Sequence, residues 1–425
     1  MQVVWFKKDL RIADHAPLFQ ACKAGPCLCL FVYEPELIGS EEFDGSHLDF
    51  LNQSLKGLDQ QLRNRGGSLV TRFGEVTQVL SEINERHSIE ALWSHEETGN
   101  SLTYERDKRV LAWTKERHIP WNESPQSGVV RRLKNRDGWS AQRNQFMAKP
   151  LTPIPERIPC VKDVDTIGLR GHQDLGLRES RKTNLILGGE VAANELLNSF
   201  LHDRGQYYSK EMSSPTTAYD SCSRLSASIT WGCLSVRQIV QALRDRQVEL
   251  REEKKSGKLT KGWLTSMRSF DARLSWHCHF MQKLEDEPRI EFQNMSRVYD
   301  GLREDDFSVE RFELWCEGKT GYPLVDACMR ALKEHSWINF RMRAMLVSFS
   351  SYHLWLHWRK SAVFLAKHFL DFEPGIHFSQ VQMQSGTTGI NTVRIYSPIK
   401  QVKDQDPDGV FIKRYVPELA GVPKE

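Results

Sequence analysis

The sequence lacks the cysteine patterns that hold metals or disulfide frameworks. Its nine cysteines are scattered, only Cys27 and Cys29 lie close together, and no CxxC pair occurs. No cysteine follows Cys328, so a C-terminal iron–sulfur cluster would have no ligands. In the run His-Cys-His at 277–279, adjacent side chains diverge around a helix, which argues against a metal. We therefore expect no metal and a protein of the reducing cytoplasm, with a nuclear or organellar location left open.

Long apolar runs and a strong charge of either sign are also missing. The N-terminus opens on an apolar segment without a basic and apolar signal, and the sequence predicts no membrane span. Lys and Arg number 58 against 55 Asp and Glu, a formal net charge of +3. The net charge therefore does not indicate a nucleic-acid-binding protein, although a chain with this net charge can still carry a local basic face. The oligomeric state is not visible in the sequence, and a monomer is the simplest expectation.

Over residues 1–130, short apolar runs alternate with amphipathic segments. The pattern predicts strands at Val3–Phe6, Cys27–Tyr33, Ser68–Arg72 and Ala91–Ser94, and helices at Leu48–Arg63, Val76–Glu85 and Glu105–Glu116. Such alternation is typical of an α/β domain with a parallel, Rossmann-like sheet covered by helices on both faces. No GxGxxG follows the first strand, so a dinucleotide in the usual Rossmann position is not supported.

The chain is long for one hydrophobic core, and its pattern changes twice, which indicates two domains and a connector. Prolines crowd between Pro150 and Pro159 and polar residues follow, so residues 131–187 are assigned to the connector. From 188 to 425 helical periodicity dominates and predicts an all-α domain. Its expected helices are 234–250, 263–284, 308–316, 323–335 and 339–369.

A cluster of small hydroxyl residues surrounds one arginine at 221–226, Ser-Cys-Ser-Arg-Leu-Ser, just before a predicted helix. Hydroxyls, free backbone N–H groups and Arg224 together suit a pyrophosphate. The alternative is a serine-rich helix cap with a surface arginine. On the residues alone, both interpretations stay open.

A second group of cations lies further along the helical part. Arg341 and Arg343 are two positions apart on a predicted helix and therefore point in different directions. They stand among apolar neighbours, so a solvated face is disfavoured, and a buried arginine would need a partner. Asp371 and Glu373 are the natural candidates.

These motifs, in this order, resemble the photolyase/cryptochrome family of flavoproteins. The resemblance is strongest at 221–236, 315–326 and 394–419, and Lys-Lys-Asp-Leu-Arg at 7–11 looks like the opening signature of the family. It implies an N-terminal α/β antenna domain and an all-α C-terminal domain that holds a U-shaped FAD. Family members usually run some tens of residues beyond Leu419, so this C-terminus is expected to be short.

The resemblance also implies roles for individual residues. For FAD they are Tyr208 on the adenine side, Ser223, Arg224, Leu225 and Ser226 at the phosphates, and Arg341, Arg343, Asp371, Glu373 and His377 around the isoalloxazine. For damaged DNA they are Trp276, His277, Asn339, Arg341, Lys400 and Gln401. Trp276 is expected to stack a flipped-out base, His377 to lie near flavin N5, and Trp358 to be the middle residue of an electron relay.

The chain departs from the family at positions that matter for repair. The Glu and Arg that usually flank the base-stacking Trp are Arg273 and His277 here. Loss of that Glu weakens a repair assignment, because it hydrogen-bonds the lesion. Val381 and Met383 stand where two further Trp residues are usual.

The second of these departures affects the electron relay. No Trp follows Trp358, so the usual flavin-proximal relay Trp is missing. Trp355 or Tyr396 would have to offer another route. The same segment is rich in amide and hydroxyl side chains and has the alternative interpretation of a polar surface loop; these residues are Gln380, Gln382, Gln384, Thr387 and Thr388.

The function implied by the resemblance is light-driven DNA repair, in which reduced FAD lends an electron to a pyrimidine dimer. The alternative is a cryptochrome-like photoreceptor without repair activity, and a flavin-binding scaffold without photochemistry is a third interpretation. An antenna chromophore near Trp93–Arg109 would be a pterin or folate, a deazaflavin, or absent. Cyclobutane and (6-4) lesions are not separated, because the discriminating positions are the substituted ones.

Overall fold

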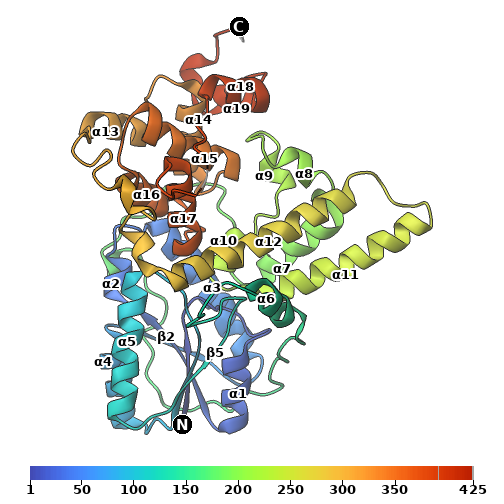
Figure 1. The fold of residues 1–425 in the computed structure, drawn as a ribbon. Helices are drawn as coiled ribbons and strands as arrows, with labels where there is room; N and C mark the ends of the chain where they lie inside the picture. The colour runs from blue at the N-terminus through green and yellow to red at the C-terminus, as the bar shows by residue number, and fades with distance from the viewer. Residues whose placement is uncertain (391, 424–425) are drawn as a thin grey trace.

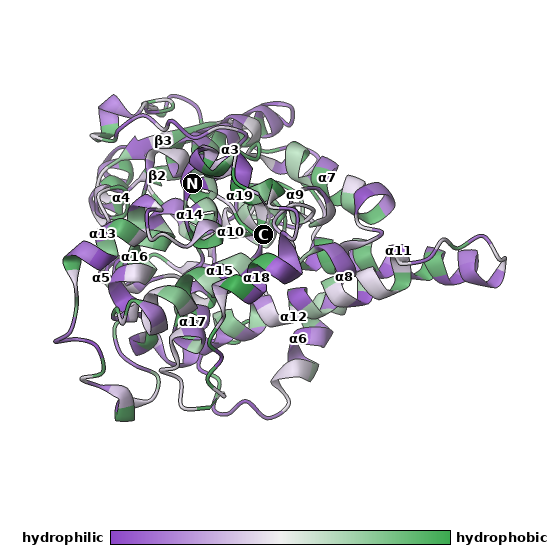
Figure 2. Ribbon diagram, turned by 90° about the horizontal axis from the view of Figure 1, so that it is seen from above, coloured by the Kyte–Doolittle hydropathy of each residue, from purple (hydrophilic) through white to green (hydrophobic). Residues whose placement is uncertain are grey.

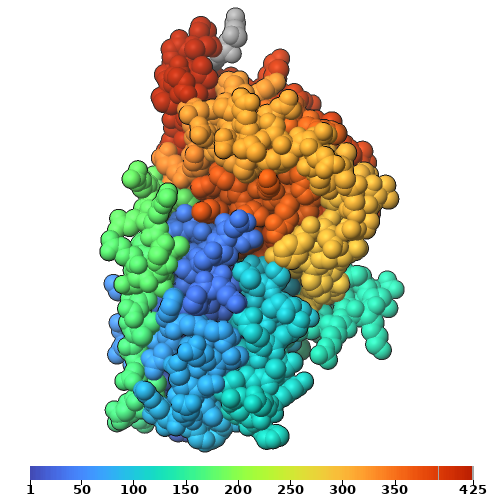
Figure 3. Space-filling model, turned by 90° about the vertical axis from the view of Figure 1, so that its left-hand side faces the viewer, coloured from blue at the N-terminus to red at the C-terminus, as the bar shows by residue number. Residues whose placement is uncertain are grey.

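A computed structural model describes residues 1–390 and 392–423. An α/β part at the N-terminus carries a helical part above it, and the two chain ends lie at opposite extremes of the molecule (Figure 1). The connector, green in Figure 3, runs along the surface of the α/β part toward the helical part. Within the described residues, no helix has the length and apolar character needed to cross a membrane.

The α/β part is built on a five-stranded parallel sheet with the order β3-β2-β1-β4-β5. The strands are β1 (Gln2–Phe6), β2 (Cys27–Tyr33), β3 (Leu69–Phe73), β4 (Ala91–His95) and β5 (Trp121–Ser124). The chain winds from β1 to β3 in one direction and then returns to the other side of β1. The carboxyl ends of β1 and β4 therefore form a topological switch point, where α/β sheets usually bind ligands.

Alternate residues of β1 enter two different cores, because neighbouring side chains of a strand point to opposite faces. Val4 and Phe6 belong to the core that includes α1 (Ala16–Ala24) and α3 (Gly45–Arg63). Val3 and Trp5 belong to the core with α4 (Val76–Arg86) and α5 (Ser101–Glu116). The first core continues into the helical part through Trp231 and Leu234. The two parts are thus fused through one hydrophobic core.

Of the remaining helices, α2 lies in the α/β part, α6 lies in the connector, and the others form the helical part. In chain order, the remaining helices are α2 (Pro35–Ile38), α6 (Trp139–Ala148), α7 (Glu190–Ser199), α8 (Tyr208–Glu211), α9 (Ala218–Ser221), α10 (Ser226–Thr230), α11 (Val236–Lys255), α12 (Trp263–Asp286), α13 (Val309–Glu317), α14 (Pro323–His335), α15 (Phe340–Ser348), α16 (Trp358–His368), α17 (Pro374–Ser385), α18 (Pro398–Gln405) and α19 (Val410–Tyr415).

The pattern missed several elements and joined two others wrongly. Among the elements that were not predicted are strand β5 and helices α1, α17, α18 and α19, and the expected helix 339–369 is broken between α15 and α16. A π turn at Phe349–His353 and a left-handed Trp355, with φ 56°, interrupt it. Neither Gly nor Pro marks the break, and the apolar periodicity continues through it, so the sequence pattern does not indicate it. The interpretation of the segment after His377 as a surface loop is wrong, because most of it belongs to α17, where Val381 and Gln382 are buried.

Gly232 shows why the junction of the two parts depends on one glycine. Its φ is 67°, and a Cβ there would lie 2.2 Å from the carbonyl oxygen of Lys8. Its own carbonyl accepts a hydrogen bond from Nη1 of the buried Arg11 at 2.9 Å. The backbone of the first strand end and that of the helical part can therefore approach this closely only without a side chain.

Candidate functional site

A cavity of about 540 Å³ lies in the helical part, between α15, α16 and α17. We call it the α17 cavity. Its wall is mostly apolar, with a few polar groups that converge on it, as is typical of ligand sites. The lining residues are Phe340, Arg343, Ala344, Val347, Leu365, Phe369, Asp371, Phe372, Glu373, Ile376, His377, Gln380, Val381 and Gln384.

Arg343 and Asp371 form a two-point ion pair on this wall. Nη1 lies 3.0 Å from Oδ1 and Nη2 lies 2.9 Å from Oδ2. Burial opposes ionisation of Asp371, but Arg343 outweighs it and Ser226 adds a hydrogen bond, so the pKa of the carboxyl is lowered. Asp371 thus connects the α17 cavity with the hydroxyl cluster at 221–226. Pairing with one of the two arginines is what the sequence predicted for Asp371.

Arg224 is enclosed by aromatic rings and is not a surface residue. Its guanidinium carbon lies 3.9 Å from the ring centre of Tyr219 and 4.0 Å from that of Trp337. Only 5% of the residue is exposed, and burial lowers the pKa of its guanidinium. The interpretation of the cluster as a cap with a surface arginine is therefore wrong. The backbone of Arg224 is left-handed, with φ 59°, a conformation that its packing must hold in place.

Four guanidinium groups converge on the loop at 221–226. Burial raises the pKa of the Cys222 thiol to about 12, while Arg224, Arg204, Arg343 and Arg273 all act to lower it. Arg204 also donates to the carbonyl oxygens of this loop, at 2.8 Å for Ser223 and within hydrogen-bond distance for Cys222. So many cations around one small loop create a site for a doubly charged anion.

Orphaned polar atoms point to a missing ligand at the same place. Nε of Arg224 and Nε of Arg341 are buried and have no hydrogen-bond partner among the residues described. Buried donors in proteins are normally satisfied, so an acceptor group is expected there. The arginine-rich loop and the adjoining α17 cavity therefore fit a phosphate-bearing ligand with a large planar ring.

Tyr208 and Ser223 border the loop on its inner side. The Tyr208 ring packs edge-on against Phe200 and Phe270, and its hydroxyl bonds to Arg273. The hydroxyl of Ser223 accepts the backbone N–H of Leu225 at 3.4 Å. Leu225 itself is buried in the core shared by the two parts. Tyr208 thus lies near Cys222 of this loop, and the assignment of Tyr208 and Ser223 to the two ends of FAD stays a prediction.

His377 lies on the wall of the α17 cavity as a neutral imidazole. Burial lowers its pKa to about 4, and Nε2 lies 2.8 Å from the carbonyl oxygen of Ala362. Because Nε2 must donate to that carbonyl, Nδ1 carries a lone pair. His377 is thus a hydrogen-bond acceptor for any ligand N–H in the cavity.

Glu373 does not pair with an arginine, although the sequence offered it as a partner for one. Its Oε2 lies 2.8 Å from Nε2 of His277. Burial lowers the pKa of His277, but the Glu373 charge outweighs it, and the pKa rises to about 10. Glu373 lines both the α17 cavity and a second polar cavity between the two parts.

The expected relay residue Trp358 is buried behind the cavity wall. Its Nε1 donates to Oδ1 of Asn294 at 2.7 Å, and its ring lies 6.5 Å from the ring of Phe378. Phe378 in turn lies 5.4 Å from His377. Trp355 lies nearer the surface, 39% exposed. An unbroken series of rings therefore joins the cavity wall to Trp358.

Three of the residues expected at DNA do reach the surface. Trp276 is 49% exposed on α12, which packs along α17, and its ring stacks on Phe280 at 5.6 Å. Lys400 is exposed on α18, and Arg341 is half-buried at the start of α15. Phe340, which lines the α17 cavity, is also 49% exposed.

The other three do not reach the surface, contrary to the expectation. The side chain of His277 is 12% exposed and pairs with Glu373. Asn339 donates to the carbonyl oxygens of Met212 and Ser213, and Gln401 is buried on α18. These three side chains position the helices beneath the surface and are not available to a docked strand.

One cluster has the composition of a metal site but is satisfied without a metal. Among the described residues, only Asp9, His15 and His95 bring such ligand atoms together. Nδ1 of His15 accepts the backbone N–H of Leu18, so its proton sits on Nε2, 3.0 Å from Asp9. His15 then has no free lone pair for a metal, and the cluster is a hydrogen-bonded support for the first strand end.

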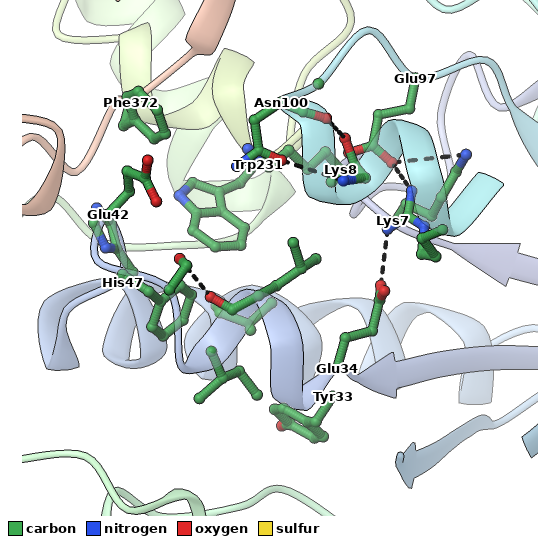
Figure 4. Close-up of a pocket in the computed structure, with 18 of the residues that line it drawn as sticks. Lys7, Lys8, Tyr33, Glu34, Glu42, His47, Glu97, Asn100, Trp231 and Phe372 are labelled. Atoms are coloured by element: carbon green, nitrogen blue, oxygen red, sulfur yellow. Dashed lines mark hydrogen bonds and ion pairs between the residues drawn. The ribbon is translucent and has the colours of Figure 1, made fainter. Parts of the chain in front are cut away.

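A larger pocket, of about 890 Å³, lies at the switch point of the sheet, where the two parts meet. We call it the switch-point pocket. Figure 4 shows Trp231, Phe372 and His47 toward one side and Lys7, Glu34 and Glu97 toward the other. Arg106 joins the charged side, 2.8 Å from Glu34 and 2.6 Å from Glu97. Burial raises the pKa of Glu34 to about 7.

Several of these residues could not be found from the sequence. Arg204, Tyr219 and Trp337 lie in separate elements, and only the tertiary fold brings them to Arg224. Arg273 was visible only as a departure from the family pattern. The only signal in the sequence was the single Arg224 within the hydroxyl cluster.

Comparisons with known families match two separate stretches of the chain. Residues 2–141 match the family described as DNA photolyase, and residues 270–425 match the FAD binding domain of DNA photolyase. The matches cover the α/β part and the helices that form the α17 cavity.

Individual proteins are similar over the whole chain at low identity. A cryptochrome DASH of Gloeobacter violaceus is 28% identical over 99% of this chain and 86% of its own length. A deoxyribodipyrimidine photo-lyase of Streptomyces griseus is 29% identical over 99% and 90%. The fold is similar to that of a class III photolyase from Agrobacterium tumefaciens, with TM-score 0.85, 22% identity and coverage of 100% and 88%.

Proposed function

The chain belongs to the DNA photolyase/cryptochrome family of FAD-binding proteins, and we propose that it is a light-driven DNA repair enzyme that splits pyrimidine dimers. The observation that carries the proposal is the surface around the α17 cavity. The half-exposed Phe340 lines the cavity, and the half-exposed Trp276 stands on the helix packed along α17. A flipped base needs such a combination of an aromatic platform and an open cavity.

The residues present fit FAD. The ion-paired α17 cavity suits an isoalloxazine, and the arginine-rich loop suits the pyrophosphate. The holding residues would be Tyr208, Ser223, Arg224, Leu225, Ser226, Arg341, Arg343, Asp371, Glu373 and His377. Bound FAD supplies light absorption and one-electron transfer. This chain supplies the binding, the buried Asp371–Arg343 pair and the neutral His377.

Damaged DNA would dock on the same face. Arg341 and Lys400 would meet phosphates, which fix position without reading sequence. Trp276 would stack on the extruded base. Extrusion costs about a few kcal/mol, and less for a damaged pair, which favours the lesion over intact DNA. Ring splitting needs no acid–base pair from the protein, because transfer of one electron to the dimer is what starts it.

A photoreceptor without repair activity is the second candidate. Arg273, which stands where the family usually has a lesion-binding Glu, bonds to Tyr208. A guanidinium has no acceptor, so Arg273 cannot accept the hydrogen bonds that the Glu would accept from a lesion. The named relatives include cryptochromes as well as photo-lyases.

We also propose a second chromophore in the switch-point pocket. Lys7 lies 3.7 Å from Glu97 and 3.3 Å from Asp107 behind the wall, and Arg106 pairs with Glu34 and Glu97, so these two cations are neutralised by neighbouring carboxylates. The remaining wall is largely aromatic and aliphatic. A flat, weakly charged ring such as a deazaflavin fits this balance better than a folate with its carboxylate tail.

Illumination of a dimer-containing oligonucleotide with purified, yellow protein tests the function. We expect restored pyrimidines under blue light, with cyclobutane and (6-4) substrates compared side by side, and none in the dark. Lesion binding without repair would favour the photoreceptor. A colourless preparation that cannot be reconstituted with FAD would exclude both candidates.

A further inference from the structure

The positive charge of the chain is concentrated in one segment. Residues 254–276 contain six Lys or Arg and a single acidic residue, Asp271, a net charge of +5. The whole chain carries only +3, so all the rest has a net charge of −2. The balanced composition thus conceals a strongly basic local surface.

This segment forms the outer end of a helical hairpin. The distal part of α11, the loop at 256–262 and the start of α12 project from the body of the molecule (Figure 1). Hydrophilic residues prevail toward its tip (Figure 2). Lys254, Lys258 and Lys261 are exposed at or near this tip. We call the projection the α11–α12 arm.

One further cation, Arg268, lies on the face of α12 that leads from the arm toward Trp276. Thr265, Arg268, Ala272 and Trp276 follow each other at intervals of three and four residues, and all four are exposed. Within the described residues, no ion pair to a carboxylate occupies Lys254, Lys258, Lys261 or Arg268, in contrast to Lys255, which pairs with Glu252. Three unpaired charges therefore face solvent at the tip, and Arg268 adds a fourth between the tip and Trp276.

We propose that the α11–α12 arm binds the phosphate backbone of duplex DNA on one side of the lesion. The inference rests on the proposed function, because Trp276 defines where the damaged base docks. Trp276 lies thirteen positions after Trp263 on α12, which spans about 20 Å at 1.5 Å per residue. At about 3.4 Å per nucleotide, this covers about six base pairs of flanking duplex.

The chemistry of the tip favours a nucleic acid over other acidic partners. Leu259 is the single apolar side chain between Lys254 and Lys261, and it is half-buried. A membrane-binding helix or a protein interface would need exposed apolar anchors at its centre. A row of mobile cations without such anchors suits a regular array of phosphates.

The test is the salt dependence of DNA binding by a triple variant, Lys254→Gln, Lys258→Gln and Lys261→Gln. Each lost phosphate contact lowers the slope of log K against log salt by about 0.9, so we expect a decrease of about 2 to 3 for a lesion-containing duplex. The matched control replaces Lys56, Lys115 and Lys162, which are exposed on the α/β part and the connector. It removes the same charge and should leave the slope unchanged.

The arm lies on one side of Trp276, so the two flanks of the lesion should differ. Lengthening one flank by about 10 base pairs, one duplex turn, should strengthen binding by the parent but not by the arm variant. Lengthening the other flank should affect both equally. Equal slopes for the arm variant and the control would overturn the inference while leaving lesion binding intact.

Two further results would also overturn it. Arm-dependent binding to anionic lipid vesicles that matches binding to the duplex would mean that the arm takes a different partner. If the parent binds no lesion-containing duplex, both the proposed repair function and DNA binding by the arm are contradicted. Retained FAD absorbance in every variant shows that the helical part is intact.

Discussion

Nε2 of His277 lies 2.8 Å from Oε2 of Glu373, so the residue after the exposed Trp276 faces inward onto a carboxylate of the α17 cavity. Adjacent positions on α12 therefore serve different purposes. One presents a ring to the surface, and the other ties α12 to the start of α17.

This ion pair predicts a pH dependence of stability. The pKa of His277 is raised from 6.5 to about 10 in the folded protein. A group with a raised pKa stabilises fully below its unfolded pKa, and this contribution is lost as the pH rises through the folded value. Between about pH 6.5 and 10, we expect the free energy of unfolding of the parent to fall by about a few kcal/mol relative to that of His277→Gln. Urea unfolding at a series of pH values measures it, and parallel profiles would contradict it.

The Arg343–Asp371 pair predicts that removing its carboxylate lowers the free energy of unfolding even in the absence of FAD. Asp371→Ala leaves Arg343 partly buried and unpaired, because only 22% of its side chain is exposed. Breaking such a pair costs about 3 kcal/mol, measured by unfolding of the FAD-free protein. Arg341→Ala is the control, since Arg341 has no carboxylate partner in the described part of the chain. Similar losses for both would contradict the role of the pair.

Arg224 predicts a change in FAD affinity that can be separated from folding. Arg224→Gly keeps the left-handed backbone without strain and removes the caged guanidinium. We expect FAD binding to weaken by about 1.5 to 3 kcal/mol, roughly tenfold to a hundredfold, as for a lost charged hydrogen bond. Flavin fluorescence titration measures it. Unchanged affinity would place the pyrophosphate elsewhere.

Trp358 predicts a slower photoreduction of the bound flavin. Trp358→Phe removes the oxidisable ring but keeps its bulk beside Phe378, and we expect the rate to fall several-fold under blue light with thiol present. Trp355→Phe is the matched variant, because Trp355 lies nearer the surface. An unchanged rate in the first and a reduced rate in the second would assign the route to Trp355.

Gly232 predicts a steric cost at the junction of the two parts. Gly232→Ala places a Cβ 2.2 Å from the carbonyl oxygen of Lys8, while Gly257→Ala meets nothing within 4 Å at a similar positive φ. Both pay about 1 kcal/mol for the left-handed backbone. We expect at least about 2 kcal/mol more from the collision at Gly232, by analogy with overpacking. Equal unfolding midpoints for the two variants would contradict it.

The parallel α/β domain and the helical domain were predictable from the sequence, and so was an acidic partner for Arg341 or Arg343, but not which residue pairs with which. Strand and helix periods are local properties, and a buried arginine requires an acidic partner wherever the chain brings one. Trp355 marks the limit of this reasoning, because its left-handed backbone breaks a helix that the apolar pattern continues.

The sequence by itself determined the types of element and the residue chemistry, because both follow from neighbours along the chain. Only the tertiary structure decided that Arg224 lies between Tyr219 and Trp337, that Glu373 turns to His277, and that a nearly neutral chain carries a basic arm. Burial, pairing and exposure depend on distances between residues far apart in the sequence, and those distances are set by packing.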